Sequence, residues 1–259
     1  MSDDESEISR MWRDWFMTDA YKVEKQLFRV FRSLPHDPRC WICYSPFDGV
    51  GGLMMRTLFG RRQSTLNPHF CNVCEDFAQK HPGGDVVEMS MLFADVRGST
   101  VLSEQMTPTE FSRLINRFYV RSTNAIIREN GLVEKLAGDA VAAFWGAGFA
   151  GPDYVGRTIR TAQNIQGIMD REKIPVGIGV HAGIAYFGAM GSANGLVNIS
   201  AIGDEVNTAA RLASKAAAGE IIVSEKALSQ AHIDHDKLEA RSLKLKGISE
   251  PVAVRVMRS

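Results

Sequence analysis

The chain has 259 residues, enough for one large domain or two smaller ones, and its 45% hydrophobic content is sufficient for a packed core. Thirty basic and 30 acidic residues cancel, so the overall charge does not support a polyanionic partner, and we expect no nucleic acid partner. The N-terminal segment is too charged for a signal peptide and no apolar run approaches the ~20 residues that span a bilayer; we therefore expect no transmembrane segment and a cytoplasmic location.

Two amphipathic helices are predicted within residues 8–33, where apolar residues recur at helical spacing. These residues are Ile8, Met11, Trp12, Trp15 and Phe16, followed by Val23, Leu27, Val30 and Phe31. Residues 39–84 show only weak periodicity, and the stretch HPGGD at 81–85 indicates a boundary. We therefore predict an N-terminal region over residues 1–84 and a second domain over residues 85–259.

Four cysteines form two C-x-x-C pairs, Cys40 with Cys43 and Cys71 with Cys74, separated by 27 residues. All four lie between residues 40 and 74, which is not the spread of a secreted disulfide framework. Two close pairs of thiolates are typical of a tetrahedral structural zinc site, and the same ligands can hold an iron–sulfur cluster. Zinc is the first expectation, an iron–sulfur cluster the alternative, and thiol–disulfide switching or unliganded cysteines stay open.

The second domain is predicted to mix strands and helices. The segment 86–96 is predicted as a buried strand, and Thr107, Pro108 and Glu110 carry the signature of a capped helix start. Gly138 and Asp139 predict a two-residue hairpin. Further along, the pattern predicts a helix at 153–170, β-structure interrupted by glycine at 176–190, a helix at 203–217, a strand at 220–224 and closing strands within 241–257.

Two aspartates stand at predicted strand ends. Asp95 ends the strand at 86–96, and Asp139 lies at the hairpin tip, 44 residues later. Two such carboxylates brought together would make an all-oxygen site suited to Mg²⁺ or Mn²⁺, which also bind substrate phosphates. The backbone N–H groups of the following loop could turn toward phosphate oxygens; its residues are Val96, Gly98, Ser99 and Thr100. Ordinary turn and capping roles are the alternative for both aspartates.

Four segments in order, FADVRGST, EKLAGDAVAAFW, GIGVHAGIAYFGAMG and AIGDEVNTAARL, make residues ~86–257 resemble the catalytic domain of class III nucleotide cyclases. The resemblance implies an α+β, ferredoxin-like domain that pairs head to tail. ATP or GTP would bind between two domains and be converted to a 3′,5′-cyclic monophosphate and pyrophosphate. The N-terminal helices and the four cysteines would precede this domain as a small metal-binding region.

The resemblance also implies roles for particular residues. Asp95 and Asp139 correspond to the pair that holds two Mg²⁺ or Mn²⁺ ions, and Lys135 corresponds to the residue that reads the base. A lysine suits the adenine N1 acceptor, whereas guanylate cyclases usually present a glutamate. The partner position falls on Ser200, where many relatives have aspartate or threonine, and a hydroxyl there can accept from the adenine amino group.

Asn207 and Arg211 correspond to the residues that orient the ribose and stabilise charge on the transferring phosphoryl group. They are four residues apart and so share one helix face, which could equally be a solvated surface. His181 is expected to be structural rather than a catalytic base.

We therefore expect an adenylate cyclase that acts on ATP as a homodimer with two shared sites, and that is regulated by its N-terminal metal-binding region. A guanylate cyclase and a catalytically silent nucleotide-binding regulator are the alternatives.

Overall fold

The computed structural model describes residues 3–35, 37–191 and 195–258, and it divides into two compact units. The N-terminal unit extends to Val87 and includes Tyr186–Ile202. The sheet unit consists of Glu88–Ala185 and the chain from Gly203 onward. The domain boundary predicted at Gly84 stays a prediction.

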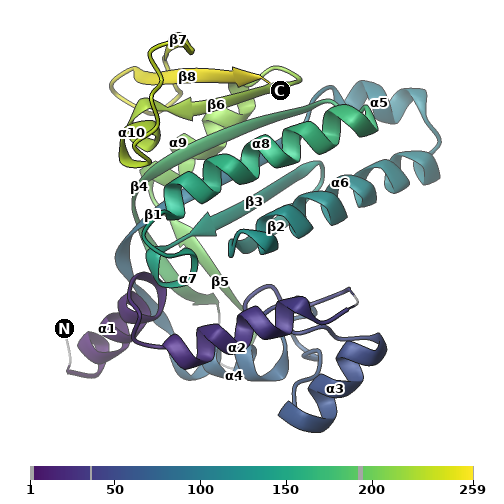
Figure 1. Ribbon diagram of the computed structural model, residues 1–259, viewed down its shortest axis with the longest axis vertical. Helices are drawn as coiled ribbons and strands as arrows, with labels where there is room; N and C mark the ends of the chain where they lie inside the picture. Colours follow the sequence, from purple (N-terminus) through teal and green to yellow (C-terminus); the bar gives the residue numbers. More distant parts are fainter. Residues whose placement is uncertain (1–2, 36, 192–194, 259) are drawn as a thin grey trace. The chain divides into compact units, whose positions relative to one another are not determined.

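Helices dominate the N-terminal unit (Figure 1). They are α1 (Asp3–Met17), α2 (Lys22–Ser33), α3 (Gly49–Phe59) and α4 (Asn72–Lys80). The first two confirm the pair of helices predicted from helical spacing. In α2 the spacing did not identify the buried face, because Val23, Leu27 and Val30 are exposed whereas Phe28 and Phe31 are buried. The other two lie where the sequence showed weak periodicity: α3 begins with three glycines among its first four residues, and α4 is capped by Cys71, whose sulfur accepts from the Cys74 N–H.

Aromatic rings form the core of the N-terminal unit. Trp12, Trp15 and Phe16 of α1 are almost completely buried. The Phe16 ring lies 4.1 Å from that of Phe187, and the Trp12 ring lies 5.4 Å from that of Phe77, centroid to centroid. Edge-on and tilted ring pairs of this kind add to the stabilisation from buried area alone. The apolar face predicted for the first helix is therefore the face that is buried.

Strands β1 (Gly83–Val96) and β4 (Val176–Gly191) each belong to both units along their length. The last part of β4 pairs antiparallel with β5 (Val197–Ile202), and Gly188 lies opposite Ser200 in that register. Gly84 and Gly188 permit close backbone approach, because a Cβ on either residue would overlap with the other strand.

The sheet unit is built on strands in the order β2-β3-β1-β4-β6-β8-β7. The additional strands are β2 (Leu132–Ala137), β3 (Ala140–Trp145), β6 (Glu220–Ser224), β7 (Glu239–Leu243) and β8 (Val252–Arg258). β1 pairs antiparallel with β3, while β4 pairs parallel with β6. This mixed sheet confirms the predicted α+β class, and the β2–β3 turn confirms the hairpin at Gly138 and Asp139.

Helices α6 (Pro108–Arg128) and α8 (Tyr154–Glu172) run side by side across the sheet (Figure 1). The predicted cap of α6 is confirmed: the Thr107 side chain accepts from the Glu110 N–H, and the Glu110 carboxylate accepts from the Thr107 N–H. The remaining helices are α5 (Ser99–Gln105), α7 (Ala147–Ala150), α9 (Asp204–Lys215) and α10 (Glu225–Gln230).

The glycines of β4 do not interrupt the strand, contrary to the sequence prediction. Gly177, Gly179 and Gly183 lie on one face of a continuous strand. A Cβ added to each would overlap, in that order, with Ala216, Ala213 and Glu205. Their missing side chains therefore admit α9 to unusually close packing on the strand.

None of the helices in the described ranges is both long enough and apolar enough to cross a membrane.

Candidate active site and cysteine cluster

The two aspartates named from the sequence are brought together where β1 meets the β2–β3 hairpin. Asp95 is paired with Ala140 in the β1–β3 register, and the Val96 N–H donates to the Asp139 carbonyl oxygen at 2.9 Å. Partial burial raises the pKa of Asp95 most; the nearby Arg97 opposes this, and the negative charge of Asp139 adds to the rise. Two neighbouring carboxylates whose charges repel are suited to a divalent cation.

Arg97 is a site neighbour that the sequence reasoning missed. One of its terminal nitrogens lies 2.6 Å from an Asp95 carboxylate oxygen. Its Nε donates to the Asp95 carbonyl oxygen, and Nη1 donates to the carbonyl oxygen of Ser214. The signal was its position two residues after Asp95, since residues two apart on a strand share a face. Arg97 lies in the turn just beyond the end of β1, where strand alternation no longer fixes the direction of a side chain, so spacing alone did not predict the ion pair.

The loop after Asp95 leads directly into α5. Gly98 adopts a left-handed conformation with φ of 66° at the start of that helix, and a Cβ there would meet no other atom within 4 Å. Val96 is buried, Ser99 is partly buried and Thr100 is exposed. Whether this loop binds phosphate stays a prediction.

The other predicted residues of the sheet unit come from different elements. Lys135 is exposed on β2, beside a register shift between Val133 and Lys135. Asn207 is exposed and Arg211 is partly buried on α9. Within the described chain, no hydrogen bond or ion pair joins any of these three to Asp95 or Asp139.

Gly247, which the sequence reasoning did not single out, lies beside the Arg211 guanidinium. A Cβ on Gly247 would be 3.4 Å from an Arg211 terminal nitrogen, and its φ of 73° favours glycine. Ser200 lies in the N-terminal unit, on β5, where it is partly buried.

His181 lies in a buried network rather than in an open site. Its Nδ1 is 2.7 Å from the Ser224 hydroxyl oxygen, and its Nε2 contacts the Glu205 carboxylate. Glu205 also accepts from Lys226 at 2.8 Å. Burial lowers the pKa of His181. The network joins β4 to the first turn of α9, the helix that carries Asn207 and Arg211.

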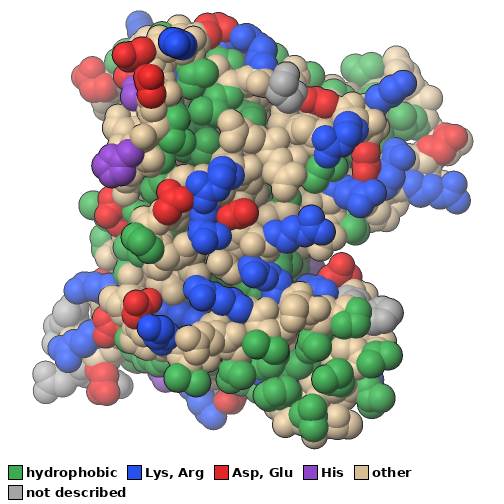
Figure 2. Space-filling model, in the orientation of Figure 1, with side chains coloured by type: hydrophobic (Ala, Val, Ile, Leu, Met, Phe, Trp, Pro, Cys, Tyr) green, Lys and Arg blue, Asp and Glu red, His purple; other side chains and the backbone are tan. Residues whose placement is uncertain are grey.

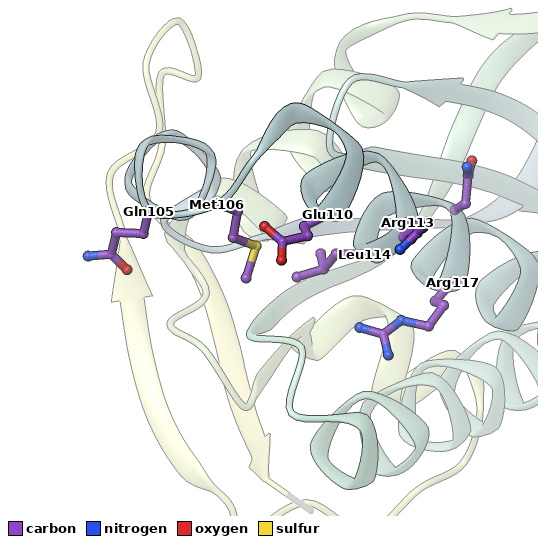
Figure 3. A pocket seen from close by; sticks show the side chains of 7 residues that line it. Gln105, Met106, Glu110, Arg113, Leu114 and Arg117 are labelled. Atoms are coloured by element: carbon purple, nitrogen blue, oxygen red, sulfur yellow. The ribbon is translucent and has the colours of Figure 1, made fainter.

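A hollow of about 680 Å³ opens on the sheet unit along α6 (Figure 3). Arg113 and Arg117 line it one helical turn apart, together with Glu110 and Met106. None of the site residues predicted from the sequence lines it. The hollow is therefore separate from the predicted chemistry.

The four cysteines do converge in the N-terminal unit. All are buried and free of disulfides, and their sulfur atoms lie within 4.8 Å of one another. The Cys71 N–H donates to the Cys40 sulfur at 3.3 Å, and the Cys43 and Cys71 sulfurs are 3.7 Å apart. Four buried sulfurs in such a group are suited to a soft metal ion.

The strand order, the hairpin and the matched sequence define the sheet unit as a class III nucleotide cyclase catalytic domain. The adenylate and guanylate cyclase catalytic domain family matches residues 84–254, and the chain belongs to this family.

The chain is similar to several curated proteins. An uncharacterized protein of Mycobacterium tuberculosis is 31% identical over 176 residues, which are 66% of this chain and 32% of that protein. An adenylate cyclase of Anabaena cylindrica is 28% identical over 185 residues, which are 64% of this chain and 36% of that protein. The chain thus spans about a third of the length of the curated relatives it matches.

Solved structures show the same fold. The guanylyl cyclase Cya2 has a TM-score of 0.63 at 24% identity, covering 67% of this chain and 93% of that chain. The adenylyl cyclase CyaB from P. aeruginosa has a TM-score of 0.60 at 25% identity, covering 67% of this chain and 95% of that chain. These neighbours match the cyclase fold while differing from each other in substrate.

Proposed function

We propose that this protein is an adenylate cyclase that converts ATP to 3′,5′-cyclic AMP and pyrophosphate at sites shared between two identical chains. The observation that carries the proposal is the juxtaposition of Asp95 and Asp139 at the β1 end and the β2–β3 turn, inside a domain of the cyclase family.

The two carboxylates fit a pair of Mg²⁺ or Mn²⁺ ions, because they are adjacent and partly exposed, and the charge of Asp139 contributes to the raised pKa of Asp95. Such ions, when bound, lower the pKa of an attacking hydroxyl and neutralise a triphosphate. The Arg97 guanidinium contacts one carboxylate oxygen of Asp95, and we expect the Arg97 side chain to turn away when the ions bind. The Arg97 guanidinium is then free to meet a phosphate oxygen.

Lys135 donates to the adenine N1, and Ser200 accepts from the adenine amino group. Asn207 orients the ribose, while Arg211 binds phosphate oxygens through its planar fork. Backbone N–H groups from Val96 to Thr100 contact the triphosphate.

A second copy of the chain completes each site. Support comes from the separation of roles within one chain, since no hydrogen bond or ion pair among the described residues joins Lys135, Asn207 or Arg211 to either aspartate. A symmetric pair would place the aspartates of one chain opposite Asn207 and Arg211 of the other.

The four cysteines hold either a structural zinc ion or an iron–sulfur cluster, and the region around them regulates the cyclase. This part rests on the buried sulfur cluster.

A guanylate cyclase is the second candidate, because Ser200 replaces the more usual base-reading residue and solved neighbours include guanylyl cyclases. A silent nucleotide-binding regulator is the third.

One assay separates the three. The purified chain is incubated with ATP or GTP in the presence of Mn²⁺, and cyclic nucleotide and pyrophosphate are quantified. We expect cyclic AMP with an equal amount of pyrophosphate. Cyclic GMP in excess of cyclic AMP would establish the guanylate cyclase, and nucleotide binding without any product would establish the regulator.

A further inference from the structure

The spacing of the four cysteine sulfurs distinguishes between the two kinds of metal centre. In a tetrahedral zinc–thiolate site the metal–sulfur bond is about 2.3 Å, so neighbouring sulfurs lie about 3.8 Å apart. The Cys43 and Cys71 sulfurs are 3.7 Å apart, and no pair among the four exceeds 4.8 Å. The cluster therefore has the dimensions of four ligands around one ion.

An iron–sulfur cluster needs a wider cage. Its four thiolates are divided among two or four iron atoms, so sulfurs on separate irons are ~6 Å apart. Opening the present arrangement to that width would displace residues that are completely buried, since Cys40, Cys43 and Cys71 have no exposed surface.

Arg61 is an additional component of this centre. One terminal nitrogen of its guanidinium lies 3.4 Å from the Cys43 sulfur, 3.4 Å from the Cys71 sulfur and 3.9 Å from the Cys74 sulfur. Four thiolates around a divalent ion leave an excess of about two negative charges, which a guanidinium partly neutralises. A cation so close to three sulfurs fits thiolates rather than thiols.

Arg61 reaches the cysteine sulfurs because it directly follows the end of helix α3. Helix α3 stops at Gly60, whose φ of 62° reverses the chain, and the Arg61 N–H donates back to the Met55 carbonyl oxygen. The guanidinium carbon also lies 5.3 Å from the ring centre of Phe31 and 5.9 Å from that of Phe28, both on α2. Arg61 thus contacts the sulfurs on one side and α2 on the other.

We propose that the four cysteines hold one tetrahedral divalent ion of the zinc class rather than an iron–sulfur cluster, and that Arg61 is the positioning residue that stabilises its thiolates and connects it to α2. The inference deepens the metal-binding part of the proposed function, and its test does not depend on cyclase activity.

The first measurement is the metal content of the full chain, purified anaerobically without chelator. We expect one zinc per chain, little iron and no visible absorption. After exchange with Co²⁺, the protein should show the visible bands of a tetrahedral cobalt–thiolate centre. Iron with acid-labile sulfide and a broad band near ~400 nm would overturn the single-ion site, and so would a protein without metal.

The second measurement compares Arg61→Ala, Arg61→Lys and Arg62→Ala by chelator competition for zinc. Arg62 is the matched control, because it is the neighbouring arginine and is exposed. Loss of an outer-shell partner typically weakens metal affinity about 10–100-fold, which we expect for Arg61→Ala. Arg61→Lys should fall between Ala and wild type, because it keeps the charge without the planar fork.

The Co²⁺ spectrum supplies a second measurement, because a general packing defect would not change the wavelength of its charge-transfer band. Removing N–H donors raises the energy of the sulfur electrons, so the sulfur-to-cobalt charge-transfer band should shift to longer wavelength in Arg61→Ala, and less in Arg61→Lys. An unshifted band together with an affinity equal to that of Arg62→Ala would overturn the role of Arg61.

Discussion

The two units of this protein are stabilised in different ways. The sheet unit is held by ladders of backbone hydrogen bonds and by aliphatic side chains that are almost fully buried, such as Ile178, Ile222 and Val254. The N-terminal unit has aromatic rings from α1 around Phe187, and a separate group of four buried cysteines with Arg61. Loss of a metal ion should therefore affect the N-terminal unit while leaving the sheet unit folded.

Their surfaces also differ. Helix α3 of the N-terminal unit exposes a group of large apolar side chains, visible as the green area over α3 at the lower right of Figure 2. These are Val50, Leu53, Met54, Leu58 and Phe59. Helix α6 of the sheet unit instead exposes Arg113 and Arg117. Of these two helices, α3 therefore has the more apolar exposed surface.

The largest expected effect is on catalysis in the sheet unit. Asp95→Asn or Asp139→Asn should lower cyclase turnover at least about a hundredfold, because each removes a charge from the proposed metal pair. Melting temperatures should change little, since both side chains are partly exposed. Asp236→Asn, a change at an exposed acid in the same unit, is the control. Near-normal turnover in either variant would contradict the two-metal assignment.

Mixing two inactive variants tests whether sites are shared between chains. Equal amounts of Asp139→Asn and Arg211→Ala chains, after exchange, should recover about a quarter of wild-type activity, because half the dimers are mixed and one of their two sites is intact. Asp95→Asn mixed with Asp139→Asn should recover nothing. If the first mixture stays inactive despite proven exchange, or the second recovers, the shared-site arrangement is wrong.

Base selection should respond to one charge in the sheet unit. Lys135→Glu should lower kcat/KM for ATP by about tenfold or more relative to GTP, because an acceptor would then face the adenine N1 acceptor. Lys237→Glu makes the same charge change at another exposed site. An unchanged ATP to GTP ratio would show that the base is read elsewhere.

Removing metal ligands should unfold the N-terminal unit while the sheet unit stays folded. Cys40→Ser combined with Cys43→Ser should release the bound metal and reduce amide-exchange protection over residues 34–84, while strands β1, β3 and β4 stay protected within residues 88–185. Thr65→Ser is an exposed control in the same region. Unchanged metal content would show that the cysteines are not ligands.

The smallest effect concerns acid stability of the sheet unit. Glu220 accepts hydrogen bonds from Arg241, which lowers its pKa to about 2 with further help from Arg258. A carboxyl whose folded pKa lies below its ordinary value of 4.5 adds stability above that value and loses it as the pH falls toward 2. Glu220→Gln should therefore flatten the fall in melting temperature across this window, whereas Glu250→Gln, an exposed control, should not.

Local sequence was sufficient for features that depend on a few neighbouring residues. The capping box of Thr107 and Glu110, the turn at Gly138 and the helical spacing of α1 each involve residues within one or two turns of one another. The family resemblance covered the catalytic domain because four motifs occur in order. The two C-x-x-C pairs indicated their own cluster through their spacing.

Tertiary structure decided what depends on partners distant in the chain. The glycines of β4 appeared to interrupt a strand, but they are required by α9, some 30 residues further along. Helix α3 has apolar residues on both its buried and its exposed sides, so its sequence showed only weak periodicity. The sequence analysis singled out neither Arg97 nor Arg61, because only folding brings the first to Asp95 and the second to three cysteine sulfurs. A charged side chain takes its role from the group it meets in the fold, and local spacing does not specify that group.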